Sequence, residues 1–139
     1  MGLGELDKGF ARRFPTKILI VEDNLVNLKI ALMLIEKLGY ENIQTASNGK
    51  EALAVLEDEE IDLIFMDLQM PEIDGLEATR KIRILEAEDP AVFHPRTIIA
   101  LTANASPSIR NQCFEAGMNH YISKPINTRM LAEAIALQH

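Results

Sequence analysis

Four short apolar runs constrain the fold of this chain most strongly. They are rich in Ile, Leu and Val, are separated by helix-length segments, and occupy residues 17–21, 61–66, 97–101 and 121–123. Near-continuous apolar runs are typical of parallel strands covered on both faces. Strands that alternate with helices favour a parallel sheet flanked by those helices. The pattern therefore predicts an α/β domain.

Each run is followed by side chains that carry chemistry. Glu22 and Asp23 follow the first run, Asp67 the second, Thr102 the third and Lys124 the fourth. The carboxyl ends of parallel strands meet at one edge of a sheet, where open α/β folds place their sites. We therefore expect three carboxylates, one hydroxyl and one ammonium in a single crevice.

This set of groups suits a divalent cation beside a phosphoryl group. Carboxylates are ligands for Mg²⁺, and a cation relieves the repulsion between clustered acids. With a cation bound, an oxygen of Asp67 is placed to attack phosphorus and form an aspartyl phosphate. The ammonium of Lys124 is a phosphate partner, and Pro125 after it fixes the backbone and can take the cis form.

Taken singly, these residues have ordinary explanations. Acids near a helix N-terminus are favourable by themselves, threonine is common in strands, and most lysines are solvated. The order of all five positions, rather than any one of them, carries the functional interpretation.

Periodicity predicts five helices and a fifth, short strand. The helices are expected after Asp23, near 51–56, from 75 to 85, from 107 to 117 and from 128 to 137, with the strand at 42–46. Ser106 and Pro107 indicate the start of the fourth helix, Gly117 its end, and Thr128 the cap of the last.

Two segments are predicted to lie outside the regular structure. Residues 1–16 show no clear period and are interpreted as a linker or an expression remnant with one short turn near Leu6 to Phe14, and the domain is expected to cover 17–139. Residues 86–95 are acidic and bounded by proline, which indicates a solvated connection.

Composition excludes several classes of function. A chain of 139 residues fits one domain, and its net charge of −7 argues against direct nucleic-acid binding. The single Cys113 excludes an internal disulfide and favours a reducing compartment, so we expect a cytoplasmic location. No apolar run approaches the roughly 20 residues that span a bilayer, so no membrane contact by this domain is expected, although a longer parent could be membrane-anchored.

The order Glu22-Asp23, Asp67, Thr102, Lys124-Pro125 resembles the receiver domain of two-component response regulators. The supporting segments are 20–24, 66–75, 100–103 and 116–125, and the resemblance runs from about residue 17 to 137. Further positions resemble the receivers fused to hybrid sensor histidine kinases: Asn27, Gln69 and Asn104.

The resemblance implies a flavodoxin-like fold, with a five-stranded parallel sheet in the order 2-1-3-4-5 and five helices. It implies that Asp67 takes a phosphoryl group from a histidine of a kinase domain or of a histidine phosphotransfer protein. Mg²⁺ would be held by Asp23, Asp67 and the backbone carbonyl of Gln69, with Glu22 acting through water.

The remaining roles also come from the resemblance. Thr102 and Lys124 would bind the phosphoryl oxygens, and Pro125 would support the loop that carries Lys124. Tyr121 would be the switch residue that responds to phosphorylation. Water would slowly remove the phosphoryl group, so the domain is expected to be a self-resetting acceptor rather than an enzyme with an external substrate.

Three other interpretations remain open at this point. A nucleotide- or flavin-binding domain would need a phosphate loop rich in Gly, Ser and Thr after the first strand, where this chain has Glu22-Asp23-Asn24. A metal-dependent phosphohydrolase would need a second acid just after the nucleophile, where Gln69 stands. A receiver that only binds proteins would be expected to lack one of the site residues. The sequence leaves the oligomeric state open, and an excised receiver is expected over a single-domain regulator.

Overall fold

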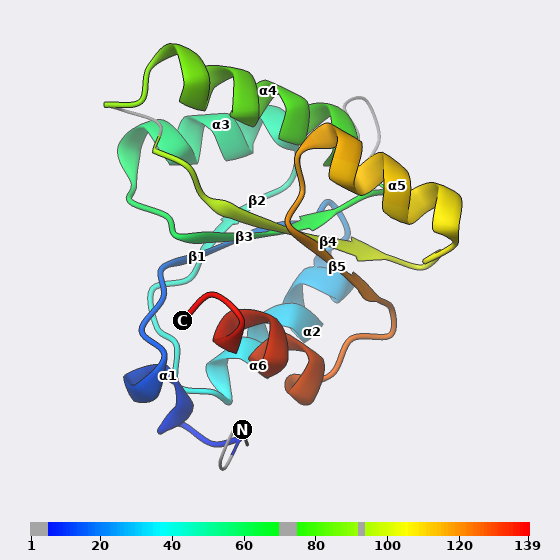
Figure 1. Ribbon diagram of the computed structural model, residues 1–139. Coiled ribbons are helices and arrows are strands. Elements are labelled where there is room, and N and C mark those ends of the chain that lie inside the picture. Colours follow the sequence, from blue (N-terminus) through cyan, green and yellow to red (C-terminus); the bar gives the residue numbers. More distant parts are fainter. Residues whose placement is uncertain (1–5, 70–74, 92–93) are drawn as a thin grey trace.

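The computed structural model describes residues 6–69, 75–91 and 94–139. Five parallel strands form one sheet between two layers of helices (Figure 1). The strands are β1 (Ile18–Val21), β2 (Gln44–Ala46), β3 (Leu63–Asp67), β4 (Thr97–Thr102) and β5 (His120–Ser123). Their order is β2-β1-β3-β4-β5, which confirms the fold implied by the resemblance.

The helices lie on both faces of the sheet (Figure 1). One face is covered by α1 (Phe10–Arg13), α2 (Leu25–Glu36) and α6 (Thr128–Ala136), and the other by α3 (Gly49–Asp58), α4 (Gly75–Glu88) and α5 (Pro107–Ala116). Successive strand side chains point to opposite faces. Leu19 accordingly belongs to the core under α3–α5, and Ile20 to the core under α2 and α6.

The strand register places the predicted site residues at one edge. Val21 pairs with Met66, and Asp67 pairs with Leu101, so the ends of β1, β3 and β4 are level. Thr102 in turn pairs with Ser123, directly before Lys124. The sheet therefore delivers all four strand ends to the same side of the molecule.

Helix ends follow local chemistry, with one correction. Ser106 Oγ accepts a hydrogen bond from the Ile109 N–H at 3.3 Å, and α5 ends at Gly117 with φ +108°, both as predicted. The predicted cap of the last helix was wrong by one residue. Asn127 is extended and its side chain accepts from the Met130 N–H at 2.9 Å, so Thr128 is the first helical residue.

The lead-in before residue 17 contains the expected short turn, but it packs on the domain. Its described part contains α1, a sixth helix, and the Phe10 side chain is 0% exposed in the core with Leu38 and Tyr40. Because those contacts join residues about thirty positions apart, no local pattern could indicate them. The boundary at residue 17 stays a prediction, but the segment before it packs on the domain.

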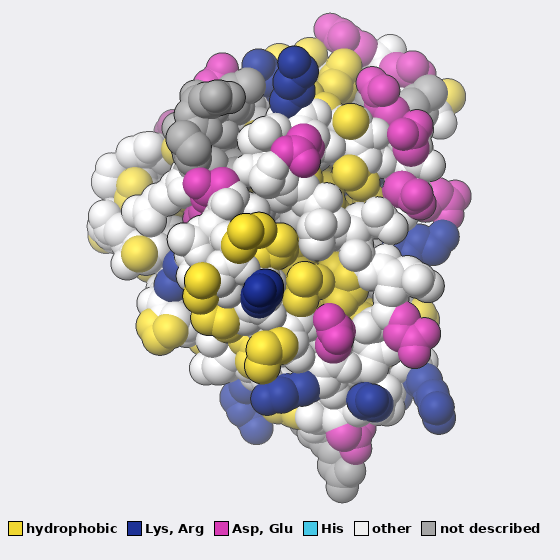
Figure 2. All heavy atoms as spheres, turned by 180° about the vertical axis from the view of Figure 1, so that it is seen from behind, with side chains coloured by type: hydrophobic (Ala, Val, Ile, Leu, Met, Phe, Trp, Pro, Cys, Tyr) yellow, Lys and Arg dark blue, Asp and Glu magenta, His cyan; other side chains and the backbone are white. Residues whose placement is uncertain are grey.

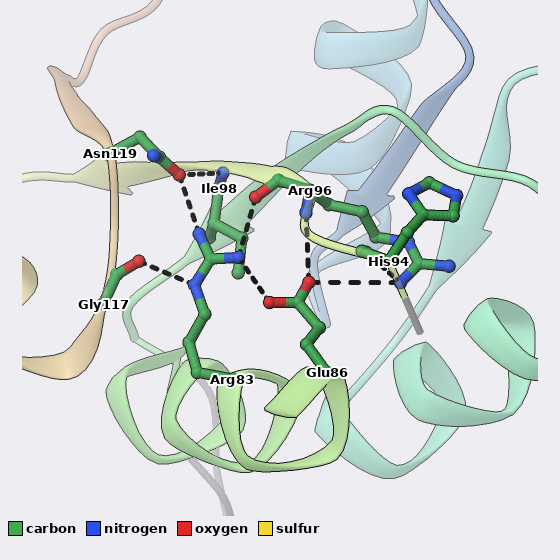
Figure 3. A network of polar contacts seen from close by, with 7 residues as sticks. All are labelled: Arg83, Glu86, His94, Arg96, Ile98, Gly117 and Asn119. Carbon is green, nitrogen blue, oxygen red and sulfur yellow. Dashed lines mark hydrogen bonds and ion pairs between the residues drawn. The ribbon is translucent and has the colours of Figure 1, made fainter. Parts of the chain in front are cut away.

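The acidic stretch from residue 86 is exposed as predicted at residues 87–91, 94 and 95, and Glu86 alone of its described residues is buried. Helix α4 continues to Glu88, and the Glu86 side chain is buried within a polar network (Figure 3). Arg83 donates to Glu86 at 2.8 Å and to the carbonyl oxygens of Arg96 and Gly117 at 2.8 and 2.9 Å. The network ties α4 to the starts of β4 and β5. Within the described residues no helix is long and apolar enough to cross a membrane.

Candidate functional site

Three carboxylates converge at the carboxyl edge of the sheet. Each of Glu22, Asp23 and Asp67 offers an oxygen within 4.8 Å of the other two, an arrangement that could hold a metal ion. Glu22 and Asp67 are 4% and 2% exposed, whereas Asp23 is exposed. The cluster is therefore anchored in the core and open to solvent on the Asp23 side.

Lys124 reaches into the cluster from the loop after β5. Its Nζ lies 3.1 Å from Asp67 Oδ1 and 3.9 Å from Glu22 Oε1. The loop is fixed by a hydrogen bond from the Lys124 N–H to the Thr102 carbonyl at 2.8 Å, and the bond to Pro125 is cis. The sequence prediction that this ammonium turns inward is confirmed.

One ammonium does not balance the buried negative charge. Burial, the hydrogen bond with Asp67 and the charge of Asp67 raise the pKa of Glu22 to about 7, against the opposing effect of Lys124. Glu22 Oε2 is buried and has no hydrogen-bond partner among the described residues. A buried carboxylate oxygen without a partner beside two further carboxylates fits a hard divalent cation.

The hydroxyl of Thr102 lies buried at the end of β4 but bonds within its own loop. It donates to the Asn104 carbonyl at 2.9 Å and accepts from the Asn104 N–H at 3.0 Å. Gln69 contributes backbone rather than side chain, since its N–H donates to Asp67 Oδ1 at 3.2 Å and its side chain is exposed. Whether its carbonyl binds a metal stays a prediction.

Two supporting residues were not recognised as such from the sequence. Gly75 begins α4 so close to Asp67 that a methyl group there would collide with the Asp67 carbonyl oxygen. Asn24 caps α2 by accepting from the Asn27 N–H at 3.0 Å, which fixes the turn directly after Glu22 and Asp23. An asparagine before a helical period was the available signal for the cap.

Comparison with known proteins places this site in a family. The family model for the response regulator receiver domain matches residues 18–136. The chain belongs to this family. The resemblance drawn from the site residues is thereby confirmed.

The receiver is similar to parts of much longer curated proteins. It is 42% identical to hybrid signal transduction histidine kinase K of Dictyostelium discoideum over 139 aligned positions, covering 92% of this chain and 11% of that protein. The chain thus spans about a tenth of that relative's length.

Solved receiver structures have the same fold. The receiver domain of the sensor histidine kinase PA1611 from Pseudomonas aeruginosa, with a magnesium ion coordinated in its active site cleft, is 37% identical with a TM-score of 0.76, covering 88% of this chain and 95% of that one. A second similar structure is a co-crystal of a Saccharomyces cerevisiae histidine phosphotransfer protein with the receiver domain of its downstream response regulator. The match is 35% identical, has a TM-score of 0.80 and covers 88% of each chain.

The predicted switch residue of the receiver lies on β5, two residues before Ser123. Tyr121 is partly buried, its hydroxyl accepts from Arg110 at 3.2 Å, and its ring meets Phe114 edge-on at 6.4 Å. It pairs in the sheet with Ala100. These contacts place Tyr121 against α5, and its role in switching stays a prediction.

A groove of about 380 Å³ opens beside the acid cluster. Its polar lining comes from Glu22, Asn27 and Lys124, and its walls are mainly aliphatic: Ile20, Ile30, Ala31, Leu101, Pro125 and Ile126. The outer face of α2 continues it with exposed apolar side chains, namely Leu25, Val26, Ile30 and Met33. Figure 2 shows hydrophobic side chains gathered around a basic one on this side of the molecule. A contiguous apolar surface of this kind marks an interaction site.

Proposed function

We propose that Asp67 of this receiver accepts a phosphoryl group from a phosphohistidine donor. The observation that carries the proposal is the buried Asp67 carboxylate at the end of the central strand, with Lys124 Nζ at 3.1 Å and two further carboxylates beside it. An oxygen of Asp67 attacks the phosphorus, the bond between phosphorus and the donor imidazole nitrogen breaks, and its electron pair returns to that nitrogen. Such transfers depend mainly on positioning and charge neutralisation.

Mg²⁺ is the cofactor that the donor set fits. Asp23, Asp67 and the backbone carbonyl of Gln69 would hold it, with Glu22 acting through water. When bound, it would neutralise charge on the transferring phosphoryl oxygens. The partnerless Glu22 Oε2 supports this assignment, as does the magnesium ion in the site of the Pseudomonas aeruginosa relative.

Lys124 and Thr102 are the proposed ligands of the phosphoryl oxygens. Lys124 is already in place, and Thr102 would exchange its bonds to Asn104 for one to the phosphoryl group. That exchange would alter the loop between β4 and α5, next to Tyr121, and so switch the surface formed by α5, β5 and α6. Pro125 would keep Lys124 aimed at Asp67.

The domain then resets by hydrolysis of its own aspartyl phosphate, so we propose an acceptor and not an enzyme acting on external substrates.

The proposed donor is a histidine kinase domain or a histidine phosphotransfer protein. The apolar face of α2 beside the groove is its proposed docking surface, because it is exposed and adjoins Lys124. The proposed parent is a hybrid histidine kinase, or another longer phosphorelay protein, in which this domain lies on the cytoplasmic side whether or not the parent is membrane-anchored.

Intact mass after incubation with acetyl phosphate tests the assignment. With Mg²⁺ the chain should gain one phosphoryl group, without Mg²⁺ none, and Asp67→Asn none in either case. The matched control is Asp58→Asn, an exposed acid on α3, which should label as the parent chain does. Labelling of Asp67→Asn equal to that of the control would contradict the proposal.

A further inference from the structure

Residues 6–16 pack at the end of α2 and α6 that lies farthest from the acid cluster. Figure 1 shows α1 on the same side of the sheet as these two helices, at the lower left and near the C-terminal end of the chain. The fully buried Phe10 ring meets Phe14 at 4.7 Å and Tyr40 at 6.4 Å, measured between centroids. The segment therefore contributes to the core on this face of the sheet.

Hydrogen bonds join the segment to the residues that follow both helices. The Ala11 N–H donates to the Leu38 carbonyl at 2.8 Å, just after α2, and the Tyr40 hydroxyl donates to the Phe14 carbonyl at 2.6 Å. Thr16 Oγ1 lies 2.9 Å from His139 Nε2, just after α6. One segment thus bridges the far ends of two helices.

Gly39, just after α2, lies close against the backbone of this segment. Its φ of +97° favours glycine. A methyl group at Gly39 would also collide with the carbonyl oxygen of Lys8. The second restriction exists only while the lead-in is docked.

The same two helices frame the groove at the phosphoacceptor site. Helix α2 begins at Leu25, directly after the acid pair, and supplies Ile30 and Ala31 to one wall. Ile126, two residues before α6, also lines the groove. A segment that joins the far ends of α2 and α6 therefore helps to set the spacing of the groove.

We propose that residues 6–16 are a positioning segment that holds α2 and α6 in the arrangement that forms the groove beside Lys124. That this groove receives the phosphoryl donor rests on the function proposed above, whereas the mechanical link does not. The segment lies outside residues 18–136, the part matched by the receiver family.

Hydrogen exchange in the full chain tests the link, with Phe10→Ala compared to Arg12→Ala, an exposed neighbour on α1. Phe10→Ala should raise exchange about tenfold or more in the last turns of α2 and α6 and leave the central strands β3 and β4 protected. Arg12→Ala should change neither. Equal acceleration in every element would mean that Phe10 supports only global stability, and would overturn the proposal.

Methyl resonances report on the groove itself. In Phe10→Ala the Ile30 and Ile126 methyl signals should shift or broaden, while those of Ile82 and Ile98 on the other face stay in place. Unchanged Ile30 and Ile126 signals in a chain with a released lead-in would also overturn the proposal. Should Phe10→Ala not fold, Phe10→Leu gives a smaller loss of packing with the same expected pattern.

A double-mutant cycle separates the collision at Gly39 from its backbone strain. Gly39→Ala should destabilise the parent chain more than it destabilises Phe10→Ala, because only a docked lead-in meets the new methyl group. Equal effects would contradict docking. Acetyl phosphate labelling of the same variants keeps the two proposals apart: labelling should persist in Phe10→Ala, and its absence even in the parent chain would refute the phosphoacceptor assignment alone.

Discussion

The carboxyl ends and the amino ends of the strands form two edges of the sheet, and both hold buried charges. These charges are balanced differently at the two edges. At the carboxyl edge, Glu22 and Asp67 share the single ammonium of Lys124, and Glu22 Oε2 has no partner among the described residues. At the amino edge, both oxygens of Glu86 are bonded, one to the Arg83 guanidinium and one to the Arg96 N–H.

This difference in hydrogen bonding distinguishes a functional site from a structural network. A buried charge with all its bonds made contributes to architecture, and removing its partner is costly. A buried carboxylate with an incomplete set of bonds and a raised pKa is a candidate for function. The first edge should therefore respond to ions and phosphoryl donors, and the second to loss of stability.

We expect the largest effect from a substitution at the carboxyl edge that abolishes labelling. Asp67→Asn removes the nucleophile, so acetyl phosphate labelling should fall to background, at least about a hundredfold. Thermal unfolding should show that the variant is folded. Labelling that persists in a folded Asp67→Asn chain would remove the contrast between the two edges.

The next largest effect is a loss of stability from a substitution at the amino edge. Arg83→Met removes the closer of the two ion-pair partners of buried Glu86 and leaves only the Arg96 guanidinium, 4.0 Å away, so the free energy of unfolding should fall by about 3 kcal/mol. Urea denaturation measures the change, and Arg80→Met, an exposed position on the same helix, should stay within about 0.5 kcal/mol. Labelling of the folded Arg83→Met chain should be retained; lost labelling with unchanged stability would reverse the assignment of the two edges.

A third test separates Mg²⁺ binding from switching at the carboxyl edge. Lys124→Ala should leave Mg²⁺ binding nearly unchanged, because the carboxylates remain, but should block the response to the phosphoryl mimic beryllofluoride. The chain has two tyrosines and no tryptophan, so fluorescence in a Tyr40→Phe background reports on Tyr121. Lys50→Ala, exposed on α3, is the control, and an equal response in both lysine variants would exclude a switching role for Lys124.

The smallest effect is a pH dependence of stability without divalent cations. The folded chain holds a proton on Glu22 up to about pH 7, whereas the ordinary pKa is 4.5. The stabilisation from this proton is fully present below about pH 4.5 and is lost as the pH rises to about 7, on the order of 2–3 kcal/mol.

Urea midpoints in chelator at pH 5 and pH 7.5 measure this change. Glu22→Gln should remove that part of the pH dependence, and Mg²⁺ should bind the parent chain more weakly as the pH falls below 7, because the proton competes with the ion. Identical pH profiles for the parent chain and Glu22→Gln would contradict the imbalance at this edge.

The carboxyl edge could be predicted from the sequence and the amino edge could not. Glu22, Asp67 and Lys124 each end an apolar run, so the rule that parallel strands share an edge was enough to bring them together. Glu86 gave no such signal, because its burial depends on Arg83 one turn earlier and on Arg96, which lies across a loop from it.

The packing of the lead-in could not be predicted for a related reason. The burial of Phe10 depends on its contacts with Leu38 and Tyr40. Glycine is needed at residue 39 because a methyl group there would collide with the backbone of Lys8. Such contacts arise only once α2 and α6 are packed together. Of the predicted loop after Asp67, residues 70–74 lie outside the described residues.

The most direct test of the central claim is to locate the phosphoryl group. The parent chain is treated with acetyl phosphate and Mg²⁺, the acyl phosphate is reduced with borohydride, and the product is mapped by peptide mass spectrometry. The account predicts that the reduced residue is Asp67 alone, and that no label appears without Mg²⁺. A label on Glu22, Asp23 or any residue other than Asp67 would contradict it.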